Sequence, residues 1–330
     1  MTLDVSNPGA FAPLFASSSF PNPKVLRQRT LKTTIGCMGV GLHSGSRVAI
    51  KLHPAEAGTG IVFKRVDLVG GGAEIPARWT NVIDSRMCTV IADDSGVSVA
   101  TVEHLMSAFY GLGVDNVVVE INGPEVPAMD GSAYPFVFLM ECAGLIELDA
   151  PRQAIRIRKP VSYANGAKLV SVEPAEVGLT VDFEIDFRAA AIGRQSCSVA
   201  VDTESFKIDV SRARTFGLLS DVTALREAGL ARGGSLENAI VVDGDRILND
   251  DGLRHANEFV LHKALDAIGD MYLTGHPIIG RFLGRCSSHA DTAKLMRQVL
   301  ADPSAWELVE LRTDMLAPAW REPMALAAIA

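Results

Sequence analysis

Strand-like and helix-like segments follow the same order in the two halves of this sequence. Each half begins with short segments in which β-branched residues alternate or cluster between Gly and Pro, which is typical of strands. A helix-like segment, a strand-like apolar run and a second helix-like segment then follow in each half. The four helix-like segments are 102–113, 132–145, 258–275 and 289–302. We therefore predict an α+β fold in which one α+β unit occurs twice.

The chain length and a shift in composition predict two domains. With 330 residues, the chain is long enough to bury two hydrophobic cores. The segment ELDAPRQ, which contains Ala150, carries a Pro and a change in composition, so we place the boundary there. The predicted parts are a flexible N-terminal extension at 1–28, a first domain at 29–150, a second domain at 151–305 with a β-α-β insert near 217–247, and a C-terminal tail at 306–330.

Composition and missing motifs argue against several classes of protein. The formal net charge is -8 and the 31 basic residues form no long run, so we expect no nucleic-acid binding. The five cysteines include no C-x-x-C pair, which favours a reducing cytoplasm over a disulfide framework. We expect no membrane span and no signal peptide, because no apolar run reaches about 18 residues and no basic segment opens the chain. Phosphate-binding loops, dinucleotide fingerprints and G-x-S-x-G motifs are also missing.

Four titratable residues recur at every fourth position of the segment EFVLHKALDAIGD: Glu258, His262, Asp266 and Asp270. On a helix this spacing places them in one stripe, each a turn above the last. His262 and Asp266 can then direct an imidazole nitrogen and a carboxylate at one point, as a helix does in many zinc sites. Polar residues at this spacing also form solvated helix faces, so the pattern leaves a metal site and a wet surface as alternatives.

The pair Glu103-His104 and the residue His289 offer further groups for the same chemistry. Neighbouring helix positions diverge by about 100°, so Glu103 would lie beside a metal bound by His104 and could accept a proton from metal-activated water. A surface-exposed helix start is the alternative. His289 opens the last helix-like segment, where a capping or surface role competes with one as a general acid oriented by Asp270.

Several longer segments resemble one enzyme family when they are taken together and in order. They are RTLKTTIGCMGVGLHSG, TVEHLMSAFYGLGVDNVVVEINGPEVPAMDGSAYPFV, SRARTFG, GGSLENAIVVD, LNDDGLRHANEFVLHKALDAIGD and SSHADTAKL. They are similar to the zinc-dependent UDP-3-O-acyl-N-acetylglucosamine deacetylases of lipid A biosynthesis in Gram-negative bacteria. The resemblance covers residues 29–301.

This resemblance implies a fold and a metal. The expected fold has two similar α+β domains, each with a β-sheet, two helices and a small insert, and the helices of both domains lie between the two sheets. One catalytic Zn²⁺ is expected between the domains, with Fe²⁺ as the alternative metal in the cell. The residues that match the family's metal ligands are His104, His262 and Asp266.

The resemblance also implies roles in a hydrolysis reaction. Glu103 would be the general base on the metal-activated water, and the hydroxyl of Thr215 would stabilise the oxyanion together with the zinc. His289 would be cationic, held by Asp270, and would act as an acid or an electrostatic partner. How Glu103 and His289 share the acid role is left open.

Eight positions match the family's contacts with its substrate. Phe187 matches an aromatic residue that stacks on uracil, Phe216 one that packs against the sugar, and Lys263 one that contacts the polar part of the substrate. The positions that match the acyl passage are Met87, Cys88, Val222, Leu236 and Val241. The family often has a His-Pro pair after the stretch around Phe187, whereas this chain has FRAAAIG.

The expected partner is therefore a UDP-linked acylated amino sugar in the cytoplasm. Peripheral contact with the inner membrane, and a regulatory protease that acts on the apolar tail EPMALAAIA, are further expectations. A zinc amidohydrolase for a different N-acylated sugar is the rival enzyme, and a ligand-binding or scaffold protein that retains the fold is the rival without activity.

Overall fold

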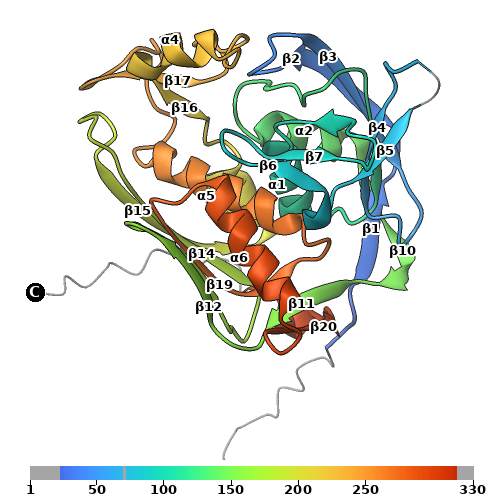
Figure 1. Cartoon of the computed structure of the whole chain (residues 1–330). Coiled ribbons are helices and arrows are strands. Elements are labelled where there is room, and N and C mark those ends of the chain that lie inside the picture. The colour runs from blue at the N-terminus through green and yellow to red at the C-terminus, as the bar shows by residue number, and fades with distance from the viewer. Residues whose placement is uncertain (1–22, 70–71, 318–330) are drawn as a thin grey trace, which may run out of the picture.

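The computed structural model describes residues 23–69 and 72–317, and these form a mixed α+β fold (Figure 1). This confirms the predicted α+β class. The described part contains six α-helices: α1 (Glu103–Leu112), α2 (Tyr134–Ala143), α3 (Thr203–Ser205), α4 (Leu219–Glu227), α5 (Glu258–Tyr272) and α6 (His289–Ala301). No helix in these two ranges is long and apolar enough to cross a membrane.

Residues from the first half of the chain form a five-stranded sheet. Its order is β2 (Ile35–Val40), β3 (Arg47–Pro54), β9 (Val117–Ile121), β4 (Ile61–Arg65) and β5 (Ala73–Pro76). The strands are antiparallel except for the central pair β9 and β4, which are parallel. Alternation along β4 buries Ile61 and Phe63, and one face of a strand against helices produces this period of two. In Figure 1 helices α1 and α2 lie beside this sheet.

Residues from the second half of the chain form a seven-stranded sheet. Its strands are β11 (Gln153–Ile157), β12 (Val161–Asn165), β13 (Lys168–Glu173), β14 (Leu179–Asp186), β15 (Arg194–Val201), β19 (Ile278–Arg285) and β20 (Trp306–Glu310). The long strand β19 pairs with β11, β13 and β14, so it links the two ends of the sheet. Helices α5 and α6 lie beside this sheet and face the first-half helices (Figure 1).

Three small sheets complete the described part. The first pairs β1 (Arg27–Leu31) with β10 (Leu145–Pro151), and the second contains β6 (Val82–Asp84), β7 (Val90–Ala92) and β8 (Ser98–Val99). The third contains β16 (Phe216–Leu218), β17 (Ile240–Asp243) and β18 (Arg246–Ile247). Strands β16 and β17 are parallel and α4 connects them, so this segment has β-α-β connectivity. Short helical turns lie at Trp79–Asn81, Phe206–Val210 and Thr313–Met315.

Two predicted terminal boundaries need correction. Residues 27–28, predicted as flexible, already belong to β1, which is hydrogen-bonded along β10. Residues 306–310, predicted as tail, form β20, because Trp306 and Leu308 pair with Ile157 and Ile155 of β11 at the sheet edge. The apolar end EPMALAAIA lies outside the described residues.

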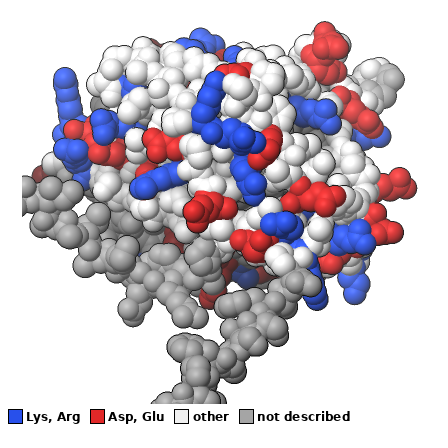
Figure 2. Space-filling view, turned by 90° about the horizontal axis from the view of Figure 1, so that it is seen from below, with Lys and Arg blue, Asp and Glu red and all other residues white. Residues whose placement is uncertain are grey.

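Charged side chains of both signs are mixed on the face that Figure 2 shows from below. At the β11–β20 end of the large sheet, Arg158 pairs with Glu307 at 2.8 Å and Lys159 with Asp302 at 2.6 Å. Exposed pairs of this kind are each worth about 0 to 1 kcal/mol, so they add little stability.

Helices α1 and α5 form the centre of the molecule, where the two halves meet. Nine of the ten residues of α1 and fourteen of the fifteen residues of α5 are buried, polar ones included. The two helices approach closely where Gly269 faces the backbone of Glu103, and a Cβ atom at Gly269 would clash with the Glu103 carbonyl oxygen. A helix that is buried on all sides cannot present a solvated stripe. The polar residues of α5 therefore need partners inside the protein.

Polar contacts at the carboxyl end of α5 also join the two halves of the chain. The hydroxyl of Tyr272 donates to the carbonyl of Val114 at 2.8 Å, and Nε of Arg152 donates to Asp115 at 2.8 Å. The neighbouring His276 is partly buried in this seam. Burial lowers the pKa of His276, and the effect of Asp115, which raises it, is opposed by two nearby arginines.

We expect His276 to make the fold sensitive to mild acid. Because its folded pKa lies below the ordinary value of 6.5, the unfolded chain takes up the proton first, and stability falls as the pH drops through that value. His276→Gln should make the free energy of urea unfolding depend less steeply on pH between about 7.5 and 5. An unchanged slope would show that His276 is protonated equally in both states.

Candidate metal centre

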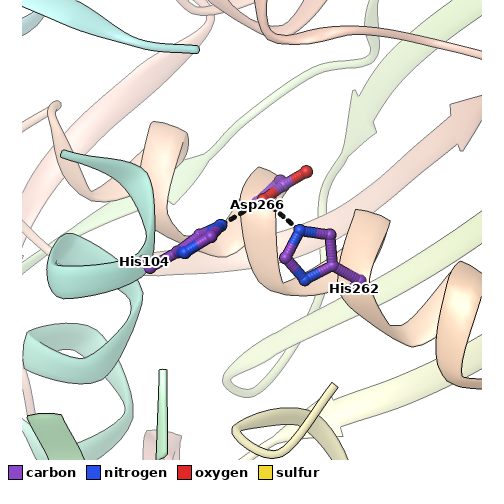
Figure 3. Close-up of side chains that lie close together, drawn as sticks. All are labelled: His104, His262 and Asp266. Carbon is purple, nitrogen blue, oxygen red and sulfur yellow. Dashed lines mark ion pairs between the residues drawn. The ribbon is translucent and has the colours of Figure 1, made fainter. Parts of the chain in front are cut away.

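Three side chains from two helices converge on one point in the interior (Figure 3). His104 comes from the first turn of α1, and His262 and Asp266 come from successive turns of α5. The Oδ1 atom of Asp266 lies 3.5 Å from Nε2 of His104 and 3.4 Å from Nε2 of His262. Ligands about 2.0 to 2.1 Å from a tetrahedral zinc are separated by about 3.3 Å, so these spacings suit one shared ion.

The chemistry of these three groups also fits a metal. All three are buried, and Oδ1 of Asp266 has no hydrogen-bond partner among the described residues, which is costly unless an ion binds it. Nδ1 of His262 donates to the carbonyl of Ala213 at 3.0 Å, which leaves Nε2 as the free ligand atom. Burial lowers the pKa of His262 to about 4, so this ring is neutral at pH 7, as a metal ligand must be.

A carboxylate and an imidazole stand beside this group. Glu103 is 3% exposed, and its Oε2 accepts a hydrogen bond from the backbone of Thr89 at 3.1 Å. Nε2 of His289 lies 3.9 Å from Oε1 of Glu103 and 3.7 Å from Oδ2 of Asp266. Burial raises the pKa of Glu103, and the charges of the two histidines beside it oppose this rise.

His289 is held as a cation by the carboxylates around it. Its Nδ1 donates to Asp270 at 2.7 Å, and the other oxygen of Asp270 accepts from the hydroxyl of Thr89 at 2.6 Å. Burial alone would lower the pKa of His289, but Asp270 and Asp266 raise it to about 9.

The second oxygen of Asp266, Oδ2, accepts a hydrogen bond from Nζ of Lys263 at 2.7 Å. Burial raises the pKa of Asp266, but His262, Lys263 and His289 together keep it well below its usual range.

These groups open into a cavity of about 890 Å³. Part of its lining is polar and includes Glu103, His104 and His289, and the part from β16, α4 and β17 is mostly apolar. Of the predicted substrate contacts, the lining includes Met87, Phe187, Phe216, Val222, Leu236, Val241 and Lys263, together with Thr215. A cavity that combines apolar lining with polar, metal-binding residues suits a ligand with an acyl chain and a polar head.

Comparison with known proteins agrees with this geometry. The family model of UDP-3-O-acyl N-acetylglycosamine deacetylase matches residues 28–301. The chain is 52% identical to the UDP-3-O-acyl-N-acetylglucosamine deacetylase of Acidithiobacillus ferrooxidans over 87% of this chain and 94% of that protein. It is 46% identical to the enzyme of that name from Vibrio parahaemolyticus, over 91% of this chain and 98% of that protein. The chain belongs to this deacetylase family. The predicted resemblance is thereby confirmed.

The structure excludes the solvent-exposed alternatives that the sequence left open. The stripe on α5 is not a wet surface, because Glu258, His262, Asp266 and Asp270 are all at most 7% exposed. The pair Glu103-His104 is not an exposed helix start, since α5 packs against it. His289 has no surface role either, because it is 8% exposed and faces the metal-binding residues.

Two predicted site residues lie outside the cavity lining. Asp270 is behind His289 and reaches the site through it. Cys88 is 8% exposed and does not line the cavity, whereas the adjacent Met87 lines it and is 48% exposed. The two neighbouring side chains differ in burial, so the motif match places Met87 in the lining but does not place Cys88 there.

Several lining residues were missed by sequence reasoning. His43 and Lys168 also line the cavity. His43 lies in a Gly-rich turn, and the buried carboxylate of Glu125 accepts two backbone hydrogen bonds from that turn, at His43 and Ser44, both at 2.8 Å. Thr89 was also missed, although it contacts both Glu103 and Asp270. A lone threonine in a strand-like segment carries no signal of such a role.

Proposed function

We propose that this chain is a zinc-dependent deacetylase that removes the N-acetyl group of UDP-3-O-acyl-N-acetylglucosamine. The products are UDP-3-O-acyl-glucosamine and acetate, and the reaction belongs to lipid A biosynthesis. One observation carries the proposal: the buried group of His104, His262 and Asp266 lies beside Glu103 and opens into the large, partly apolar cavity.

His104, His262 and Asp266 would hold one Zn²⁺, with Fe²⁺ as the alternative metal in the cell. Two imidazole nitrogens and one carboxylate oxygen are a set of ligands that catalytic zinc uses, and they leave a position for substrate or water. Bound there, the ion would supply a Lewis acid for the acetamide carbonyl and would lower the pKa of water.

Glu103 and His289 are the groups that would move protons. Glu103 would take a proton from the attacking water as the new C–O bond forms at the acetyl carbon. The C–N bond then breaks, and the leaving amine receives a proton. His289, held as a cation by Asp270, has its Nε2 3.9 Å from Glu103 and would donate that proton or stabilise the negative charge that develops.

Thr215 would stabilise the oxyanion through its hydroxyl. Its backbone is fixed on both sides, because its N–H donates to Gly131 at 2.8 Å and its carbonyl accepts from Ile240 at 2.8 Å. A donor that is already in place when charge develops is worth more than one that must reorient.

The cavity suggests how the substrate lies. The acyl chain would occupy the apolar end near Val222, Leu236 and Val241. The rings of Phe187 and Phe216 pack edge to face with centroids 5.5 Å apart, so uracil and sugar would meet two adjacent aromatic rings. The segment FRAAAIG that begins at Phe187 makes the uridine side the place where this chain departs from its family.

The proposal also covers the domain organisation and the location of the protein. The boundary near Ala150 would separate two similar α+β domains whose helices lie between the two sheets. The small sheets β6–β8 and β16–β18 would be their inserts. We place the protein in the cytoplasm, with peripheral contact with the inner membrane and regulated proteolysis of the C-terminal tail as further properties to test.

Metal removal tests this function directly. Protein stripped of metal should release no acetate from UDP-3-O-acyl-N-acetylglucosamine, and one equivalent of Zn²⁺ should restore turnover. Acetate can be measured with a coupled assay, and zinc binding by titration. Protein that binds one equivalent of zinc but releases no acetate would overturn the substrate and favour the rival amidohydrolase for a different N-acylated sugar.

A further inference from the structure

Glu258 is the one member of the α5 stripe that does not contact the metal-binding group or its neighbours. It is fully buried at the first turn of α5, where the helix dipole favours a negative charge. Its Oε1 atom accepts from the backbone N–H of Arg214 at 3.0 Å and from Nε of Arg214 at 2.8 Å. Its Oε2 atom accepts from the backbone N–H of Arg254 at 2.6 Å. This carboxylate is therefore saturated with donors and faces away from the cavity.

Arg214 is held on its other side as well. It is 3% exposed, and its guanidinium donates to the carbonyl of Gly252 at 2.7 Å and to Asp251 at 3.2 Å. The ion pair with Glu258 therefore joins the start of α5 to a segment 44 residues earlier in the chain. Two guanidinium nitrogens of Arg214, Nε and Nη2, donate to the two carboxylate oxygens of Glu258. Such a bidentate contact fixes the orientation of the guanidinium as well as its distance, so the pair constrains the backbone around Arg214.

That backbone carries two functional contacts. The carbonyl of Ala213 accepts the hydrogen bond from Nδ1 of His262, and Thr215 lines the cavity. Residues 213–215 belong to neither a helix nor a strand, so single backbone hydrogen bonds, such as those of Thr215 with Gly131 and Ile240, replace a regular ladder. Glu258 and His262 lie one turn apart on α5, and they bind consecutive residues of this segment.

We propose that Glu258 is a positioning residue, which acts with Arg214 as a buried clamp on residues 213–215. The clamp fixes the Ala213 carbonyl, and this carbonyl fixes the tautomer and ring orientation of His262. Partners of this kind typically change metal affinity by ten- to a hundredfold when they are removed. The clamp also adds to the hydrogen bonds with Gly131 and Ile240 that hold the backbone of Thr215, and this second part rests on the proposed function.

The alternative is that the pair only stabilises the fold. Buried ion pairs are poor stabilisers, because desolvation offsets most of their attraction. The pair of Asp115 with Arg152 offers a matched control. There too a carboxylate accepts from an arginine Nε, at 2.8 Å, and from a backbone N–H, that of Arg29 at 2.9 Å. It lies at the opposite end of α5, next to Tyr272.

The test measures zinc affinity by competition with a chelator in E258Q, in D115N and in the parent. We expect E258Q to bind zinc ten- to a hundredfold more weakly and to change the visible spectrum of the cobalt-substituted protein. D115N should lower the melting temperature but should leave both metal readouts at the parent values. Should E258Q fail to fold, R214K carries the same test, because lysine keeps the charge but loses the bidentate contact.

Parent-like zinc affinity and an unchanged cobalt spectrum in the folded variant would overturn the clamp. Equal losses of zinc affinity in E258Q and D115N would also overturn it, since they would indicate general loosening. These readouts need no substrate. If the parent fails to release acetate while E258Q still binds zinc more weakly than D115N, the proposed function fails and the clamp stands.

Discussion

Glu103→Ala is expected to lower the turnover of acetamide hydrolysis by at least about a hundredfold, the usual worth of a general base. The residue is buried beside the metal-binding group, and its Oε2 is held by the backbone of Thr89. His289→Ala should cause a similar loss, because it removes the α6 imidazole whose Nε2 lies 3.9 Å from Oε1 of Glu103. Steady-state acetate release with zinc supplied at one equivalent measures both.

Zinc content is the control for these two variants. Neither Glu103 nor His289 belongs to the group of three ligands, so both proteins should still bind one equivalent of zinc. Losses below about tenfold in both variants would refute the assigned roles. A loss of zinc in either would mean that the residue supports the metal-binding group itself.

Gly269→Ala is expected to damage the metal site although it introduces only a methyl group. The new Cβ would clash with the backbone oxygen of Glu103, which cannot rotate away, so α1 and α5 must separate. Because His104 lies on α1 and the other two ligands lie on α5, that separation pulls the ligands apart. Overpacking of this kind costs about 1 to 3 kcal/mol. A shift of about 1 Å at a reacting centre costs about a hundredfold in rate.

Gly111→Ala is the matched control for this variant. A Cβ atom there would also clash, but with the ring of Phe206 and at the far end of α1 from His104. Both substitutions should lower the melting temperature, whereas only Gly269→Ala should lower zinc affinity and acetate release. Equal zinc affinity in the two variants would show that the close approach of the helices is not needed to assemble the site.

Helix periodicity was sufficient to predict that two of the three metal-binding residues lie side by side. His262 and Asp266 share a face of α5 whatever the rest of the chain does, because they are four residues apart on one helix. His104 could be added only through the resemblance, since the spacing within a helix says nothing about which helix packs against it. The contact between α1 and α5 depends on Gly269, and an isolated glycine in a helical pattern does not identify its partner.

The same periodicity could not distinguish the roles within the stripe. Glu258 and Asp266 are both acidic residues on one face of α5, yet one binds an arginine and the other presents an oxygen without a hydrogen-bond partner among the described residues. That difference depends on Arg214, whose distance along the chain leaves no local signal. The assignment of residues 306–310 to the tail failed for a related reason: an edge strand is recognised by the strand it pairs with.

The division of the ligands between α1 and α5 has a consequence for the synthesis of the protein. A nascent chain that has just completed α1 holds one of the three ligands, and the other two follow more than 150 residues later, at positions 262 and 266. The high-affinity site therefore exists only after most of the polypeptide has left the ribosome and its two halves have docked. From that moment the bound ion stabilises the docked state by mass action. Metal uptake thus reports complete assembly, and truncated chains that end before α5 should not sequester zinc.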